Sequence, residues 1–220
     1  MGHKLAIDFG TTNSVVARWN EDKYATEVVS LPGLSALNLA SVPPIVPSLV
    51  YVHDAQNGHI TLGQAVRDQE LDLQKTNRLF RNFKRGIVAT PAPEPRLIDG
   101  KMWGDRDAGE HFIRQLLEVL PDRNEIEQLV MTVPVASFRG YVDWLNSMVG
   151  ATADKIRVVD ESTAAALGYA ITEPGALVLV FDFGGARSIC RWYSCLKIAS
   201  IPAAFSACSG ARPVRAMPRA

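Results

Sequence analysis

The sequence predicts an α/β fold in which helices cover both faces of a mixed β-sheet. Apolar and β-branched segments separated by short polar turns open the chain, and strand-like and helix-like segments alternate from residue 127 to residue 183. In addition, an apolar strand followed by an aspartate and a glycine turn occurs at 6–14 and again at 178–185. Strands that alternate with helices form sheets covered on both faces. The expected order of elements is βββαβαβ.

The opening segments predict an antiparallel meander. Their apolar residues alternate or cluster around short polar turns, which is typical of paired strands. The strands are expected at 4–8, 14–19 and 26–31. The turn at 10–14 joins the first two strands.

An inserted subdomain is expected over about 32–126, between the meander and the alternating part. It begins with a loop rich in Pro, Ser, Leu and Ala at 32–47. Asn57-Gly58 is a favoured hairpin turn and predicts paired strands at 48–53 and 59–62. Helical patterns follow at 64–72, 76–83 and 103–120, the last with its apolar residues on one face.

The alternating part completes the predicted sheet. Its segments change between a strand pattern and a helix pattern over short connections. Three strands are expected, at 127–133, 155–159 and 177–183, and two helices, at 137–149 and 162–171.

Charge and cysteine are unevenly distributed along the 220 residues. The 23 Lys and Arg balance the 23 Asp and Glu, yet no acidic residue follows Asp182, and Cys190, Cys195 and Cys208 all lie beyond it. The cysteine spacing fits neither a zinc site nor a redox CxxC pair. No apolar run is long enough to span a bilayer and no leader pattern precedes the first strand, so we expect a cytoplasmic protein with no membrane partner.

The first glycine turn predicts a phosphate-binding site. Gly10, Thr11, Thr12 and Asn13 offer successive backbone N–H groups, two hydroxyls and an amide, which suit phosphate oxygens. The chain contains no GxxxxGK[ST] or GxGxxG motif, so a helix N-terminus of either type is excluded as the phosphate site. A plain β-hairpin tip is the alternative interpretation.

Three carboxylates are expected at one edge of the sheet. Asp8 and Asp182 end their strands, and Glu161 lies where a strand passes into a helix. Such a group is a hard-oxygen site for Mg²⁺ that keeps several of its waters. For the segment around Glu161, helix capping is the alternative, as Asp and Ser are favoured N-caps. Lys84 lies in a basic segment, for which a solvated cationic face at a helix end is the alternative.

Five motifs in one order resemble the 70-kDa heat-shock protein chaperones, whose ATPase domain belongs to the actin and sugar-kinase superfamily. They are IDFGTTNS at 7–14, FKR at 83–85, VPV at 133–135, DESTAAALGYA at 160–170 and VFDFGG at 180–185. The resemblance covers residues 4–185 and implies a ribonuclease-H-like, actin-like ATPase lobe. It further implies ATP or ADP with Mg²⁺, and K⁺ as a second candidate cation.

The resemblance also implies roles for particular residues. Asp8, Gly10, Thr11, Thr12 and Asn13 would meet the phosphates and the metal shell. Lys84 would lie near the attacking water, and Glu161 and Asp182 would complete the catalytic and metal-water set, with Gly184 and Gly185 as the second glycine turn. In the intact relative, ATP hydrolysis would assist protein folding in the stress response, with unfolded peptide clients and J-domain or nucleotide-exchange co-chaperones as partners.

The resemblance ends at Gly185, where the family continues as GGGT(L/F)D. Restoring one G before permitted codons for residues 186–200 gives a translation that reads GTLDLSLVQLSEDRQ, which recovers both the motif and the missing acidic residues. We therefore expect residues 1–185 to form the first lobe and 186–220 to be an out-of-frame tail that is disordered or poorly packed. Such a truncated chain would keep half of a nucleotide cleft and be inactive.

Three other functions remain open at this point. An actin-like filament protein or another ATPase of the superfamily would share the first turn, but the FKR and DESTAAA segments favour the chaperone. A sugar kinase is disfavoured, as no sugar-binding polar cluster follows the first hairpin. The basic tail lacks interleaved aromatic residues, so nucleic-acid binding is not expected.

Overall fold

The computed structural model describes residues 3–36, 43–120, 125–149, 156–172, 177–184 and 187–194. The chain divides into two compact units, Met1–Val158 and Val159–Ala220, and each is described by itself. None of the helices in the described part is long and apolar enough to cross a membrane.

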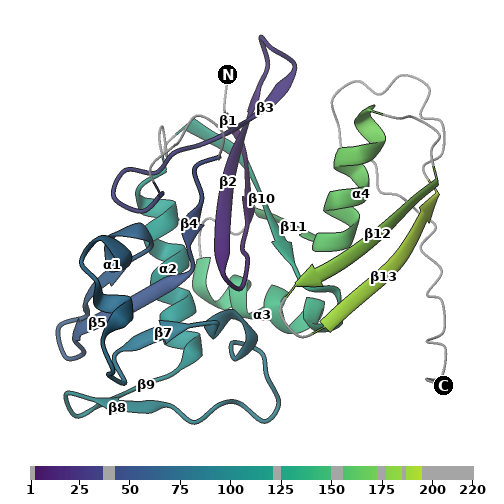
Figure 1. The fold of residues 1–220 in the computed structure, drawn as a ribbon. Helices are drawn as coiled ribbons and strands as arrows, with labels where there is room; N and C mark the ends of the chain where they lie inside the picture. Colours follow the sequence, from purple (N-terminus) through teal and green to yellow (C-terminus); the bar gives the residue numbers. More distant parts are fainter. Residues whose placement is uncertain are drawn as a thin grey trace. The chain divides into compact units, whose positions relative to one another are not determined.

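A mixed sheet forms the centre of the first unit (Figure 1). Its strands follow the order β11-β10-β1-β2-β3, and β4 pairs with β2. The meander is antiparallel, whereas β10 runs parallel to β1. The strands are β1 His3–Asp8, β2 Asn13–Asn20, β3 Ala25–Val28, β4 Val46–Pro47, β10 Ile126–Val133 and β11 Ile156–Asp160. The predicted meander and the strand predicted at 127–133 are therefore confirmed.

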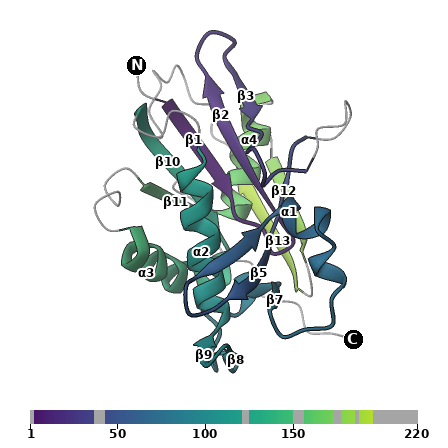
Figure 2. The same cartoon turned by 90° about the vertical axis from the view of Figure 1, so that its left-hand side faces the viewer.

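Helices α2 (Asp105–Glu118) and α3 (Phe138–Val149) pack on this sheet, and Figure 2 shows α2 running along it. Alternate residues of β1 and β10 are buried, as the two-residue period of a half-buried strand requires. They share one core cluster with apolar side chains of both helices, including Phe112, Trp144 and Leu145. We also predicted a helix on the opposite face of the sheet. The candidate is α4, which lies in the second unit, so coverage of that face stays a prediction.

The segment predicted as an inserted subdomain, about 32–126, contains a three-stranded sheet of order β6-β5-β7, and its separation as a subdomain stays a prediction. Its strands are β5 Leu49–Asp54, β6 His59–Leu62 and β7 Leu79–Arg81. Short helices α1 Gln64–Asp68, η1 Leu71–Leu73 and η2 Phe83–Arg85 accompany them, and a hairpin of β8 Arg96–Ile98 and β9 Lys101–Trp103 leads to α2. The hairpin predicted around Asn57-Gly58 is confirmed.

The helix predicted over 76–83 is wrong. Residues 79–81 form β7, which pairs with β5 and buries Leu79 and Phe80. A short apolar run does not distinguish a strand from a helix by its period, and here pairing with β5 decides. Asn82 then takes a left-handed conformation, which ends the strand before η2.

The other helices of the insert are shorter than predicted. The one expected at 64–72 stops at Asp68 and continues as separate short turns. The one expected at 103–120 begins at Asp105, because Trp103 belongs to β9. Asp107 accepts a hydrogen bond from the backbone N–H of Gly104 (2.8 Å), which fixes this helix start.

The second unit holds helix α4 (Glu161–Thr172) and an antiparallel pair, β12 (Leu177–Gly184) with β13 (Arg187–Ser194). The elements predicted at 162–171 and 177–183 are confirmed as a helix and a strand. The prediction that the strand joins the mixed sheet is not confirmed, because β12 pairs with β13 in a two-stranded sheet. The strand β13 differs from our expectation of a tail without a structural partner, because an eight-residue segment pairs with β12 through backbone hydrogen bonds that any sequence can make. Residues 195–220 lie outside the described part, and their disorder stays a prediction.

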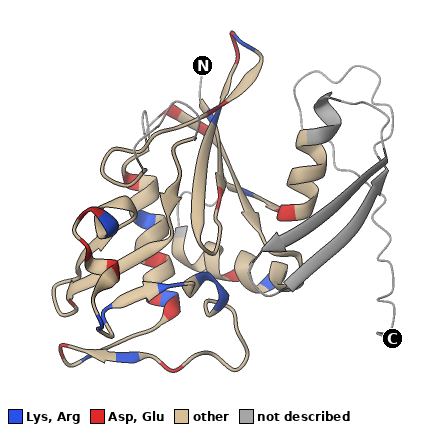
Figure 3. Ribbon diagram, viewed as in Figure 1, with Lys and Arg blue, Asp and Glu red and all other residues tan. Residues whose placement is uncertain are grey.

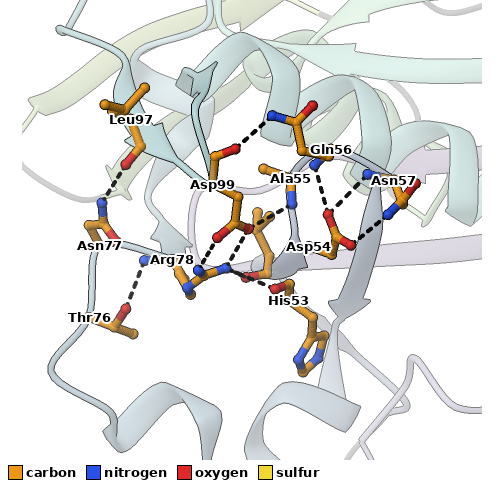
Figure 4. Close-up of polar contacts among 11 residues, drawn as sticks. His53, Asp54, Ala55, Gln56, Asn57, Thr76, Asn77, Arg78, Leu97 and Asp99 are labelled. Atoms are coloured by element: carbon orange, nitrogen blue, oxygen red, sulfur yellow. Dashed lines mark hydrogen bonds and ion pairs between the residues drawn. The ribbon is translucent and has the colours of Figure 1, made fainter.

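An ion pair fastens the β8–β9 hairpin to the three-stranded sheet (Figure 4). The Arg78 guanidinium donates to both carboxylate oxygens of Asp99 and to the carbonyl oxygens of Val52 and His53. Asp99 also accepts a hydrogen bond from the backbone N–H of Ala55 (3.0 Å). The hydrogen bond from Arg78, followed by that from Ala55, lowers the pKa of Asp99 from 3.8 to about 2.

This pKa predicts how the stability of the first unit depends on pH. Because the pKa of Asp99 is lowered on folding, its contribution is present above about pH 4 and is lost as the pH falls toward about 2. Asp99→Asn should lower the thermal midpoint at pH 7, and the difference from the wild type should shrink below about pH 4. Asp22→Asn, a change to an exposed turn carboxylate, should leave the midpoint unchanged. A pH-independent difference for Asp99→Asn would contradict the assigned linkage.

Candidate functional site

Asp8 ends β1 and lies exposed at the carboxyl edge of the strand. In the parallel register of β1 and β10 its partner is Thr132, and the Thr132 hydroxyl donates a hydrogen bond of 2.6 Å to Asp8 Oδ1. The parallel pairing therefore places Thr132 where its hydroxyl can bind one oxygen of the Asp8 carboxylate. The predicted position of Asp8 at a strand end is confirmed.

The turn of Gly10–Asn13 follows directly and joins β1 to β2. A Cβ on Gly10 would lie 2.0 Å from the backbone carbonyl oxygen of Asn13, so the chain passes too close to itself for any side chain there. Glycine is required at this position by close backbone approach. Among the described residues, the backbone amides of Gly10, Thr11 and Thr12 donate to no backbone carbonyl group.

Behind the turn, the carbonyl groups of Gly10 and Thr12 are hydrogen-bonded. Ser48 donates from its hydroxyl to Gly10 O (2.8 Å) and from its backbone N–H to Thr12 O (2.9 Å). The hydroxyls of Ser14 and Ser48 lie 3.1 Å apart, and both residues are buried. Ser48 lies between β4 and β5, so both hydrogen bonds to the turn come from the start of the segment predicted as an insert.

Lys84 holds the residue before the turn. It lies in η2, is only 4 % exposed, and donates from Nζ to the carbonyl oxygen of Phe9. Its Nζ also lies 5.3 Å from the centroid of the Phe9 ring. The alternative of a solvated cationic face is therefore wrong for Lys84, and Figure 3 shows the blue η2 segment beside the end of the β1–β2 hairpin.

Aromatic packing fixes both Phe9 and the lysine segment. Phe9 stacks on Phe112 and Trp144, with ring centroids 5.9 and 6.3 Å apart, and Phe83 lies 6.2 Å away. The Tyr141 hydroxyl of α3 donates to the carbonyl oxygen of Lys84. Helix α3 thus supports the site from within the core.

Asn13 supplies a test of whether a metal ion fits here. Its side-chain oxygen Oδ1 is buried and has no hydrogen-bond partner among the described residues. A buried acceptor without a donor is costly, and a metal-bound water would supply the donor. Carboxylate and amide oxygens, such as those of Asp8 and Asn13, are of the kind that Mg²⁺ or its bound water prefers.

The remaining predicted site residues lie in or near the second unit, and fewer of their contacts are described. Glu161 is the first residue of α4, and Asp160 caps that helix by accepting from the backbone N–H of Thr163 (2.9 Å). The capping alternative is thus confirmed for Asp160. Asp182 and Gly184 lie in β12 without described side chains, and Gly185 lies outside the described residues. Within the described part, no group of three or more His, Cys, Asp or Glu forms a metal site.

Three residues of this site escaped prediction from sequence: Ser48, Thr132 and Tyr141. Thr132 would have been the easiest of the three to predict. It is the strand residue before Val133-Pro134, and a parallel β1–β10 register places it beside Asp8. Ser48 and Tyr141 carry no local signal, since their partners are 38 and 57 residues away.

The close approach at Gly10 predicts the effect of adding a methyl group there. Gly10→Ala should destabilise the first unit by about 1–3 kcal/mol, because the turn must open to admit the Cβ. Gly168→Ala is the matched control: nothing lies within 4 Å of its added Cβ in the exposed face of α4, so stability should hold or rise by up to about 1 kcal/mol. Thermal unfolding measures the stability of both variants. Equal changes in stability would contradict the close approach at Gly10.

Curated relatives match most of this chain. The chain is 28% identical over 204 residues to the chaperone protein DnaK of Thermus thermophilus, which covers 84% of the chain and 31% of the relative. It is 28% identical over 187 residues to DnaK of Thermosipho melanesiensis and to DnaK of Thermotoga neapolitana, in each case 82% of the chain and 28% of the relative. The chain thus spans about a third of the length of these relatives, and no family model matches it. Over most of its length, the chain is therefore similar to DnaK chaperones, in agreement with the motifs that resemble the 70-kDa heat-shock protein family.

Proposed function

We propose that residues 1–185 are the first lobe of the ATPase domain of a 70-kDa heat-shock-type chaperone. The observation that carries this proposal is the turn of Gly10–Asn13. The carbonyl groups of Gly10 and Thr12, and that of Phe9 before the turn, are hydrogen-bonded from behind. The amides of Gly10, Thr11 and Thr12 donate to no backbone carbonyl within the described chain. Successive free N–H groups bind anions, and the adjacent Asp8 carboxylate suits a metal ion that accompanies a polyphosphate.

In this proposal ATP or ADP binds with its phosphates on the turn. The amides of residues 10–13 and the hydroxyls of Thr11 and Thr12 donate to phosphate oxygens. Asp8, Glu161 and Asp182 would hold the metal ion through its water ligands, and Gly184 and Gly185 would form a second turn. Mg²⁺ would supply positive charge that offsets the phosphate charge, and K⁺ is a second candidate cation.

Catalysis would consist of placing water in line with the γ-phosphate. Lys84 contributes its positive charge at the back of the turn, where its amine is already held by the Phe9 carbonyl oxygen. Glu161 and Asp182 orient water by accepting hydrogen bonds. Such sites work by positioning and charge stabilisation more than by a strong base.

Chaperone activity itself would require more than these residues. Unfolded peptide clients and J-domain or nucleotide-exchange co-chaperones are proposed as partners of an intact relative. We propose that the segment from 186 onward is read out of frame, which accounts for the absence of acidic residues after Asp182 and for all three cysteines lying there. This chain would then hold half of a nucleotide cleft.

The half-cleft proposal predicts weak nucleotide binding. Isothermal titration of the 220-residue chain with Mg-ATP should give no measurable heat at micromolar concentrations, because a nucleotide held by one lobe of a two-lobe cleft would make only part of its contacts. A micromolar Kd would contradict the half-cleft proposal. Sedimentation with and without ATP serves as a check on the filament alternative, for which ATP-dependent pelleting is expected.

The reading-frame proposal is tested at the nucleotide level. The DNA after codon 185 should encode GTLDLSLVQL once a single base is restored, and that frame should stay open downstream. Protein made from the restored gene should hydrolyse ATP, and Asp8→Asn should slow hydrolysis by about 100-fold, since a charged metal-water partner is lost. Asp22→Asn is the control and should retain the rate. A closed downstream frame would refute the proposal.

A further inference from the structure

We propose that Ser48 is the positioning residue that sets the conformation of the phosphate-binding turn Gly10–Asn13. The proposal rests on the function proposed above for that turn and adds a residue that the sequence motifs do not contain. Ser48 touches no phosphate in this role. It acts through the backbone of the turn.

The hydrogen-bond directions around Ser48 follow from its single hydroxyl proton. That proton is donated to Gly10 O, 2.8 Å away. In the 3.1 Å contact between the two serine hydroxyls, Ser14 must therefore be the donor and Ser48 the acceptor. Ser48 also donates its backbone N–H to Thr12 O (2.9 Å), so one residue binds two carbonyl groups of a four-residue turn.

These bonds determine where the amides of the turn point. In a trans peptide the C=O and the following N–H point in opposite directions. Because Gly10 O and Thr12 O face Ser48, the N–H groups of Thr11 and Asn13 point away from it. By the same geometry Lys84, which binds Phe9 O, directs the N–H of Gly10 away from itself.

Because Ser48 is buried, the conformation of the turn depends on its hydroxyl. Ser48 is 1 % exposed and Ser14 is 0 % exposed, so water does not readily replace either hydroxyl. Loss of the Ser48 hydroxyl leaves the carbonyl oxygen of the half-buried Gly10 without this donor, a state that favours rotation of the Gly10–Thr11 peptide. Loss of the Ser14 hydroxyl leaves the bond from Ser48 to Gly10 in place.

The test compares Ser48→Ala with Ser14→Ala in the full 220-residue chain. Each variant removes one buried hydroxyl, but only the first releases the turn. Amide spectra of ¹⁵N-labelled protein report the turn directly, first without ligand and then during titration with sodium tripolyphosphate. Ser48→Ala should lower the heteronuclear NOE of residues 10–13 and weaken tripolyphosphate binding about two- to tenfold, whereas Ser14→Ala should change neither.

A second pair covers the case in which Ser48→Ala does not fold. Ser48→Thr and Ser48→Val have the same shape and differ in the hydroxyl, so the threonine variant should keep the wild-type NOE values and the valine variant should not. Unchanged turn dynamics and titration in the variants that lack the hydroxyl would overturn the role of Ser48.

The same data separate this inference from the proposed function. If tripolyphosphate shifts no amide of residues 10–13 in the wild type, the phosphate role of the turn fails. A loss of order in Ser48→Ala then still supports Ser48 as the residue that fixes the turn. If the wild type binds and both alanine variants bind equally, the phosphate role stands and the inference about Ser48 falls.

Discussion

The hydrogen bonding of the carbonyl groups behind the β1–β2 turn is the constraint on which the candidate site depends. A tight turn at the end of two core strands brings backbone carbonyls toward the interior, where each needs a donor. Lys84 supplies one to Phe9, and Ser48 supplies two, to Gly10 and Thr12. Because these carbonyls face their donors, the N–H groups of Gly10, Thr11 and Asn13 point away from them, which is the arrangement on which the proposed anion site rests.

The inserted subdomain provides these donors and is therefore part of the site. Ser48 enters from the junction of β4 and β5, and Lys84 from η2 after β7. The Arg78–Asp99 pair attaches the β8–β9 hairpin to the same three-stranded sheet. These residues therefore support the turn from behind, and apolar side chains of the same segment, among them Val50, Phe80 and Phe83, join the core of the first unit.

Burial of the Lys84 amine carries a desolvation cost that the site offsets locally. The amine donates to a carbonyl oxygen and lies against the Phe9 ring, and Phe9 itself is fixed by Phe112 and Trp144. The Tyr141 hydroxyl binds the carbonyl of Lys84 from α3. The turn, Lys84 and α3 therefore form one packed arrangement.

The sequence by itself determined the strands of the meander, the hairpin at Asn57-Gly58 and the alternating elements from β10 to β12, because their patterns are local. It also placed Asp8 at a strand end and the glycine at the close approach in the turn. Tertiary structure alone decided that 79–81 is a strand, since pairing with β5 overrides a short ambiguous pattern. It likewise decided that Lys84 is buried and that Ser48, Thr132 and Tyr141 support the site, because hydrogen bonds across 38 to 124 residues depend on packing and leave no local pattern.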